Sequence, residues 1–292
     1  MKRLIISIGL ILAANFASAA PIRLGSKDFT EQHLLSAMTR LYLTEKGFEV
    51  TTTTDLPSII MRGALVNKQL DMVWDYTGTA LIVYHKLSEV NPEQSYAKVK
   101  ELDVKNGLIW LKPAALNNTY AFAMQRKRAE ELGITNMSEM VQAFNQHKEW
   151  KLGLDIEFAG RPDGLKPMQE KYQLKLDRPQ MKQMNSGLVY NAIRDGFTEV
   201  GLVYSTDGRV KGFDLLVVAD DLHFFPSYAA TPVVEKSVLD AHPGLEEAMN
   251  TLSALLNNET IITLNAKVDI EHQRVDDVAS QFLMDQGLIK GK

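Results

Sequence analysis

The chain has 292 residues, of which 45% are hydrophobic, and its formal net charge is −4. A mildly acidic chain lacks the basic face that nucleic-acid-binding proteins need, so we expect no nucleic-acid partner. The absence of cysteine excludes disulfides, a thiol nucleophile and a lipidated cysteine anchor. The length exceeds that of one typical domain and favours two lobes.

Residues 1–20 have the pattern of a secretory signal peptide. Lys2 and Arg3 precede an apolar stretch over residues 4–14, and Ala-Ser-Ala follows at residues 17–19. This pattern predicts cleavage after Ala19 or Ala20 and export to the periplasm. The alternative, a membrane anchor, is disfavoured because the apolar run is short for a bilayer.

The first part of the remaining chain alternates between strand and helix patterns. We expect strands at residues 22–25, 48–54 and 70–76, and helices at residues 28–46, 57–68 and 79–85. The helix over 28–46 carries an apolar stripe and stops at Gly47. Asp28 and Glu31 have the spacing of a capping box at its start.

A second block of the same kind follows. We expect strands at residues 120–125, 151–158, 200–204 and 215–219, and helices at residues 127–132, 137–146, 164–172 and 188–194. A return segment begins at Pro226, and helical periodicity over residues 245–256 and 275–288 closes the first block.

Two α/β blocks with a return segment predict two lobes joined by two crossings, near Asn118 and Phe225. We assign residues 21–118 and 225–292 to lobe I, and residues 119–224 to lobe II. Such a fold binds its ligand in the cleft between the lobes.

Four tyrosines lie where a strand ends or a loop begins, which is where α/β proteins place binding groups. They are Tyr76, Tyr120, Tyr204 and Tyr228. Tyrosine ring faces hold a cation that offers no hydrogen-bond donor, such as a trimethylammonium group. The alternative is that these rings are ordinary packing residues, which is the commoner role of a single tyrosine.

Three polar residues are candidates for binding an anionic ligand group. Arg161 lies between Gly160 and a Pro-Asp-Gly turn and is suited to a bidentate grip on a carboxylate, although a solvated turn arginine is the alternative. Lys27 lies between a strand and a helix start, where Asp75 is placed to balance its charge. Thr79 either donates its hydroxyl or caps the following helix.

Enzymatic constellations are missing from the sequence. The six histidines show no metal-binding spacing, and there is no Gly-x-Ser-x-Gly or phosphate-binding loop. Asp220 and Asp221 are adjacent and therefore face opposite ways on a strand. We expect neither an enzyme nor a metal or cofactor, and the output module of a sensor is also absent.

Three short motifs resemble those of one protein family. They are Gly-Ser-Lys-Asp-Phe-Thr-Glu-Gln at residues 25–32, Asp-Tyr-Thr-Gly-Thr at residues 75–79 and Tyr-Ser-Thr-Asp-Gly at residues 204–208. In order and spacing they resemble the substrate-binding proteins of osmoprotectant ABC importers. Those proteins capture glycine betaine, choline or carnitine, and the likeness covers nearly the whole chain after residue 20.

The resemblance implies a two-lobed periplasmic-binding-protein fold of type II, with two interlobe strands. It implies a cage in which Tyr76 and Tyr228 come from lobe I, and Tyr120 and Tyr204 from lobe II. The implied partners are a quaternary ammonium ligand and the membrane subunits of the importer. We expect a monomer.

The resemblance also implies ligand-binding roles for four polar residues. A betaine carboxylate is held at the positions that match Lys27, Thr79 and Arg161. Gln32 matches a position that contacts the polar end of the ligand in choline and carnitine binders. We therefore expect glycine betaine first, with choline or carnitine as alternatives, because choline would meet two cationic side chains beside its own charge.

Overall fold

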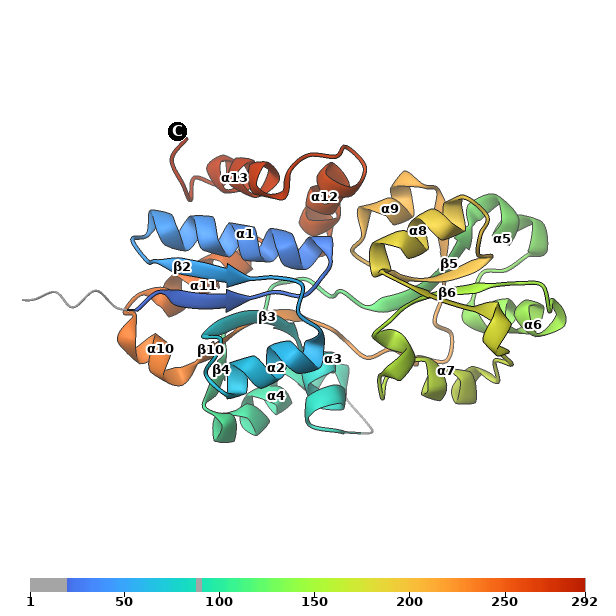
Figure 1. The fold of residues 1–292 in the computed structure, drawn as a ribbon, viewed down its shortest axis with the longest axis horizontal. Helices are drawn as coiled ribbons and strands as arrows, with labels where there is room; N and C mark the ends of the chain where they lie inside the picture. Colours follow the sequence, from blue (N-terminus) through green and yellow to red (C-terminus); the bar gives the residue numbers. More distant parts are fainter. Residues whose placement is uncertain (1–19, 88–90, 292) are drawn as a thin grey trace, which may run out of the picture.

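The computed structural model describes residues 20–87 and 91–291, and the predicted signal segment up to Ala19 lies outside the described residues. The described chain forms two α/β lobes, each built around a five-stranded sheet (Figure 1). The lobes lie side by side along the long axis of the molecule.

The first lobe is built on a sheet with the strand order β2-β1-β3-β10-β4. Its strands are β1 (Ile22–Gly25), β2 (Val50–Thr53), β3 (Met72–Tyr76), β4 (Leu108–Trp110) and β10 (Ala230–Glu235). β1 pairs in parallel with β2 and β3, whereas β10 is antiparallel to β3 and β4. The return segment therefore completes a sheet that the N-terminal residues begin.

Helices cover both faces of this sheet because successive residues of a strand point to opposite faces. Trp74 and Tyr76 of β3 belong to the core beneath α1 and α13, whereas Val73 packs with α2 and α4. The helices are α1 (Thr30–Glu45), α2 (Ser58–Val66), α3 (Thr77–Thr79) with a π-helical turn (Ala80–Tyr84), α4 (Ser95–Asp103), α10 (Lys236–Ala241), α11 (Leu245–Ala254), α12 (Asn258–Asp269) and α13 (Val275–Asp285).

The second lobe repeats this arrangement in the strand order β7-β6-β8-β5-β9. Its strands are β5 (Tyr120–Gln125), β6 (Leu152–Asp155), β7 (Met181–Met184), β8 (Val200–Tyr204) and β9 (Leu215–Val218). Its helices are α5 (Arg126–Leu132), α6 (Met137–Gln146), α7 (Leu165–Tyr172), α8 (Ser186–Arg194) and α9 (Gly208–Gly212). Phe122 faces the core under α6 and α7, and Ala123 faces α8.

Two segments of the chain cross between the lobes, residues 111–119 and 219–229. They run side by side, since Asn117 and Ala229 form an antiparallel bridge and the Asn118 amide donates to the Tyr228 carbonyl at 3.1 Å. The sheets thus divide the chain near the predicted positions, while the exact boundaries at 118/119 and 224/225 stay a prediction.

A third connection comes from the C-terminal region, where α12 packs against α9 of the second lobe (Figure 1). Gly208 is required there, because a Cβ atom at this position would lie 2.7 Å from the backbone of Ala266. The Asn265 side chain donates to the Thr206 carbonyl at 2.8 Å. This contact ties the C-terminal helices to both lobes.

Two local predictions are wrong, and both errors concern the cleft. The predicted strand over residues 151–158 ends at Asp155, because residues 156–160 turn instead and carry Arg161 toward the other lobe. The predicted capping box is absent: Phe29 is the N-cap of α1 and makes no side-chain capping bond. Glu31 is instead buried, where its carboxylate accepts hydrogen bonds from Tyr76, Asn118 and Thr206.

Candidate functional site

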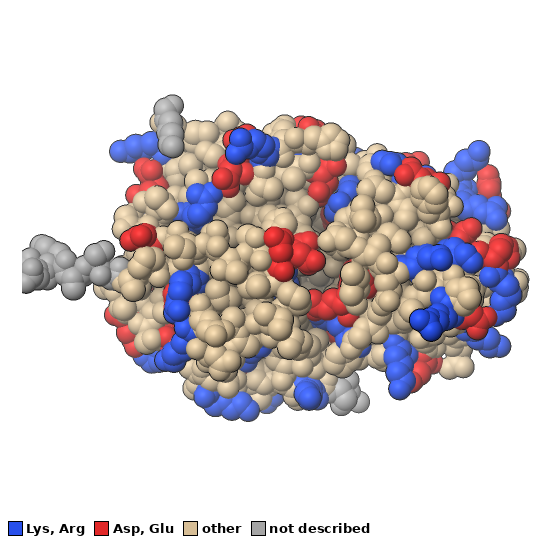
Figure 2. Space-filling model, viewed as in Figure 1, with Lys and Arg blue, Asp and Glu red and all other residues tan. Residues whose placement is uncertain are grey.

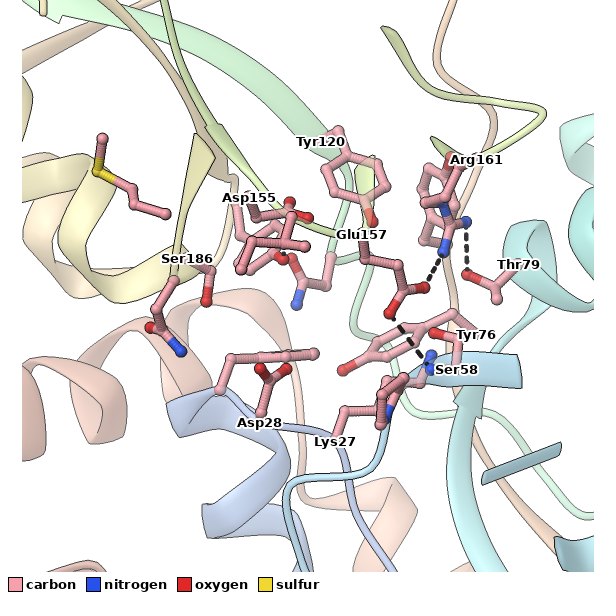
Figure 3. Close-up of a pocket in the computed structure, with 18 residues that line it drawn as sticks. Lys27, Asp28, Ser58, Tyr76, Thr79, Tyr120, Asp155, Glu157, Arg161 and Ser186 are labelled. Atoms are coloured by element: carbon pink, nitrogen blue, oxygen red, sulfur yellow. Dashed lines mark hydrogen bonds and ion pairs between the residues drawn. The ribbon is translucent and has the colours of Figure 1, made fainter. Parts of the chain in front are cut away.

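A cavity of about 340 Å³ lies between the two lobes (Figure 3). Both lobes line it, and it includes seven of the eight predicted binding residues. These are Lys27, Tyr76, Thr79, Tyr120, Arg161, Tyr204 and Tyr228. A volume of this size suits a small solute.

Strand register brings the four tyrosines together. Tyr120 at the start of β5 pairs directly with Tyr204 at the end of β8. In the other sheet, Tyr76 at the end of β3 pairs with Ala230, two residues after Tyr228. The crossing that carries Tyr228 continues into β10, and all four rings line the same cavity.

The rings form a connected cluster, which Phe29 joins from the cavity wall. The ring centroids of Tyr120 lie 5.4 Å from Tyr204 and 5.5 Å from Tyr228. Phe29 lies 5.1 Å from Tyr204 and 6.3 Å from Tyr76, and so joins the rings of the two lobes. Burial holds the pKa of Tyr120 well above its usual range, so its phenol stays neutral.

Glycine at position 78 permits this close packing. A Cβ atom on Gly78 would lie 2.7 Å from the Ser227 carbonyl oxygen and 2.9 Å from the Tyr228 ring. The Tyr-Thr-Gly-Thr segment therefore needs its glycine in order to seat Tyr228 against the cavity wall.

Arg161 crosses the cleft and is held by several groups. Its Nε and Nη2 donate to the two carboxylate oxygens of Asp163, each at 2.7 Å. Nη1 donates to Glu157 at 3.0 Å, and Nη2 also donates to Thr79 of the first lobe at 3.1 Å. The guanidinium carbon lies 5.4 Å from the centroid of the Tyr120 ring. Arg161 is therefore a buried, paired cation and not a solvated turn residue.

Lys27 is also paired. Its Nζ donates to Asp75 Oδ1 at 3.0 Å, and both side chains are almost completely buried. The same ammonium lies 5.0 Å from the centroid of the Tyr76 ring. The charge balance between Lys27 and Asp75 that the sequence suggested is present, because Asp75 points to the face of β3 opposite Trp74 and Tyr76.

Gln32 is the predicted residue that does not line the cavity. It is buried behind Tyr76, where its Nε2 donates to the tyrosine hydroxyl at 3.0 Å and to the Trp74 carbonyl at 3.2 Å. Its Oε1 accepts from the Lys27 amide at 3.2 Å. Its geometry supports a role in orienting Tyr76 and Lys27, and gives it no direct contact with a ligand in the cavity.

The cavity wall has an excess of negative charge. Three acidic residues, Asp28, Asp155 and Glu157, line it beside the two paired cations. On the face shown in Figure 2, acidic side chains gather around the hollow where the lobes meet, while many Lys and Arg side chains lie at the periphery. This distribution favours a cationic ligand.

A buried hydrogen-bond network connects Tyr76 to Asn118 in the first crossing segment and to the second lobe. Glu31 accepts from the Tyr76 hydroxyl at 2.6 Å, from Asn118 at 3.0 Å and from the Thr206 hydroxyl at 2.6 Å. Burial raises the pKa of Glu31, and these three donors partly oppose that rise. Because Thr206 belongs to the second lobe, Glu31 connects a cavity tyrosine of the first lobe to the second lobe.

Phe29, Asp155 and Glu157 are among the cavity residues that sequence reasoning missed. Phe29 stands inside the first motif, and its signal was a large apolar residue directly before a helix. Asp155 and Glu157 flank Ile156 at the end of β6. They were missed because the predicted strand ran past the point where β6 ends.

Some site types are absent from the described structure. Over residues 20–87 and 91–291, no group of three or more His, Cys, Asp or Glu side chains is arranged to hold a metal ion. Within the same ranges no helix has the length and apolarity needed to cross a bilayer.

Two α/β lobes, two paired crossings and an aromatic cavity at their junction define a two-lobed substrate-binding protein. A family model described as the substrate binding domain of ABC-type glycine betaine transport system matches residues 20–285. The chain belongs to this family, whose members are binding components of transporters.

Individual relatives agree with this assignment. A glycine-betaine-binding protein of Pseudomonas aeruginosa is 44% identical, with 99% of this chain and 96% of the relative covered. The glycine betaine-binding protein YehZ of Escherichia coli is 30% identical over 94% of this chain and 93% of its own length. A crystal structure of a glycine betaine/carnitine/choline ABC transporter protein superposes with a TM-score of 0.74 at 27% identity, covering 92% of this chain and all of the other. The predicted two-lobed α/β fold is confirmed.

Proposed function

We propose that this protein captures a quaternary ammonium solute, glycine betaine first, and delivers it to the membrane subunits of an ABC importer. The observation that carries the proposal is the cluster of aromatic rings from both lobes around a cavity of about 340 Å³. Each ring face contributes roughly 0.5–2 kcal/mol to binding a cation, depending on desolvation. The excess of carboxylates around the rings adds to the attraction.

In this proposal the methylated head lies among Tyr76, Tyr120, Tyr204, Tyr228 and Phe29. The ligand carboxylate points toward Arg161, Thr79 and Lys27, which line the same cavity (Figure 3). Because both lobes contribute rings, the ligand stabilises the closed arrangement of the lobes. Closure then distinguishes loaded from unloaded protein for the importer.

We also propose that the protein acts in the periplasm as a monomer, after removal of residues 1–19 or 1–20. The family supports this, since its members are binding components that present a small molecule to a membrane permease. Mass spectrometry of the exported protein gives the cleavage site, and size-exclusion chromatography with light scattering gives the number of copies.

Calorimetric titration with glycine betaine, choline, carnitine and proline tests the ligand. We expect saturable one-site heat with at least one trimethylated solute and markedly weaker heat with proline, which lacks the trimethylated head. If none of the trimethylated solutes gives heat, the cation cage is not a binding site for this class.

Choline is a second candidate because of how the two cations of the cavity are paired. The resemblance suggested that choline would meet unbalanced charge at Lys27 and Arg161, but Asp75, Asp163 and Glu157 neutralise both.

Ligand affinity is expected to rise with pH through about pH 6. Burial raises the pKa of Asp155 to about 6, although the Phe158 amide and Arg161 oppose the rise. A bound cation favours the ionised carboxylate, so binding releases a proton when Asp155 is protonated beforehand. We expect affinity to fall several-fold between pH 7.5 and pH 5.0, measured by calorimetry.

Asp155→Asn is the control for this pH dependence, because it removes the titrating group and keeps the side-chain shape. The variant should bind more weakly at pH 7.5 and lose most of the change between pH 5.0 and 7.5. A wild-type affinity that is flat over this range would show that Asp155 is not coupled to the ligand.

A further inference from the structure

Glu157 occupies an unusual position in the cleft. It lies just after β6, in the turn that replaces the last residues of the predicted strand. Its side chain extends between Arg161 of its own lobe and Ser58 of the other lobe, and dashed lines mark both contacts in Figure 3. It is thus a carboxylate that spans the space between the lobes.

The donors around Glu157 form a carboxylate-binding arrangement. Oε1 accepts from Arg161 Nη1 at 3.0 Å, and Oε2 accepts from the backbone amide of Ser58 at 3.2 Å. Ser58 is the first residue of the nine-residue helix α2, and Pro57 at the N-cap has no side-chain acceptor. Glu157 therefore supplies the negative charge that this helix N-terminus favours.

The same donors would suit the carboxylate of a zwitterionic ligand. A guanidinium and a helix N-terminus are both effective at holding carboxylates. Lys27 adds a third positive charge close by. Burial alone would raise the pKa of Glu157, but Lys27, Ser58 and Arg161 outweigh it and lower this pKa, so Glu157 stays ionised.

We propose that Glu157 is a tethered carboxylate that competes with the carboxylate of the ligand for Arg161 and the N-terminus of α2. It thereby sets the preference of the site between zwitterionic betaines and quaternary ammonium cations that lack a carboxylate. A betaine has to displace Glu157 from one or both donors. Choline leaves Glu157 in place, and the negative charge of Glu157 attracts its ammonium group.

The two carboxylates on Arg161 differ in how readily they exchange. The Asp163 side chain is 3% exposed, grips the guanidinium through both oxygens and also accepts from Tyr228 at 2.7 Å. The Glu157 side chain is 35% exposed and holds the guanidinium through one oxygen. Glu157 is therefore the partner that a ligand carboxylate replaces.

This inference rests on the proposed function, and its test compares glycine betaine with choline in Glu157→Gln. Glutamine keeps the shape and an acceptor oxygen but removes the charge. We expect the ratio of choline Kd to betaine Kd to rise by about tenfold or more over wild type, measured by calorimetry at pH 7.5. Betaine should bind more tightly, choline more weakly, or both.

Asp28→Asn is the matched control. It removes the same charge from the cavity wall, and the described contacts of Asp28 include no hydrogen bond or ion pair to Arg161 or Ser58. This variant measures the general effect of one lost wall carboxylate, and we expect its Kd ratio to change clearly less than that of Glu157→Gln. Thermal unfolding of each variant shows whether the fold is retained.

The outcomes separate the two proposals. If wild type binds no trimethylated solute, the proposed function fails and Glu157 has no role in ligand choice. If wild type binds and Glu157→Gln changes the Kd ratio no more than Asp28→Asn, the tethered-carboxylate role alone is overturned. Glu157→Ala is the second variant: it also removes the acceptor oxygen, and the same direction of change is expected.

Discussion

Arg161→Ala is expected to lower the free energy of unfolding by about 3–5 kcal/mol. The substitution leaves Asp163 buried at 3% exposure without its bidentate partner, and it removes the donor to Glu157. It also removes the bond to Thr79, which joins the two lobes. Denaturant unfolding of the two proteins at pH 7.5 measures the difference.

The effect should be specific to the ion pair. Asp163→Ala leaves Arg161 partly unpaired and should also lower the free energy of unfolding. In the double variant Arg161→Ala/Asp163→Ala this free energy should fall by clearly less than the sum of the two single losses. Arg161→Lys retains the positive charge but not the bidentate geometry of the guanidinium. Its free energy of unfolding should therefore lie between those of Arg161→Ala and wild type. A loss below about 1 kcal/mol for Arg161→Ala would mean that solvent already satisfies these carboxylates.

Tyr204→Leu is expected to weaken binding of the preferred trimethylated solute by about tenfold or more, which corresponds to ~1.4 kcal/mol. Leucine retains apolar contact but has no aromatic face. Tyr204 is the test position because its ring lies between Phe29 of the first lobe and Tyr120 of the second. Calorimetric titration gives the affinity.

Tyr204→Phe is the matched control for this prediction. It keeps the ring and removes a hydroxyl that makes a long bond of 3.3 Å to Asp155. We expect its affinity to stay within about threefold of wild type at neutral pH. Equal losses for leucine and phenylalanine would locate the contribution of Tyr204 in its hydroxyl, and the cation–π account would then be wrong.

Contacts between the lobes and the cavity wall share several side chains. The Tyr228 hydroxyl donates to Asp163 across the cleft, and Glu31 accepts from Thr206 of the second lobe. Because Tyr228 also lines the cavity, groups that hold the lobes together also shape the space for the ligand. Substitutions at Glu31 are therefore relevant to binding although Glu31 is not part of the cavity wall.

The four tyrosines were predictable because local sequence carries their signal. Tyr76 and Tyr204 end apolar runs that have the pattern of strands, and Tyr120 begins one. Each was therefore expected at the end of a strand, where binding groups lie in α/β proteins. The antiparallel pairing that aligns Tyr120 with Tyr204 was not predictable from either strand alone. The alternation along β3 likewise indicated that Asp75 and Tyr76 face opposite ways.

Glu31 and Glu157 show where local reasoning fails. The spacing of Glu31 from Asp28 matched a helix cap, yet the carboxylate is buried against Tyr76 and Thr206. Glu157 lay within an apparent strand, yet the chain turns at residue 156. In both cases the competing partner lies far away in sequence.

The sequence by itself indicated most of the alternating strands and helices, the return of the chain to its first lobe, and the four tyrosines and two cations that line the cavity. Hydrophobic periodicity and turn residues act over a few positions, so they can be read locally. Only the tertiary structure decided that Asp163 and Glu157 already neutralise Arg161 and that Phe29 joins the rings of the two lobes. Those outcomes depend on which distant groups the two lobes bring within a few ångströms, where burial makes each charge require a partner.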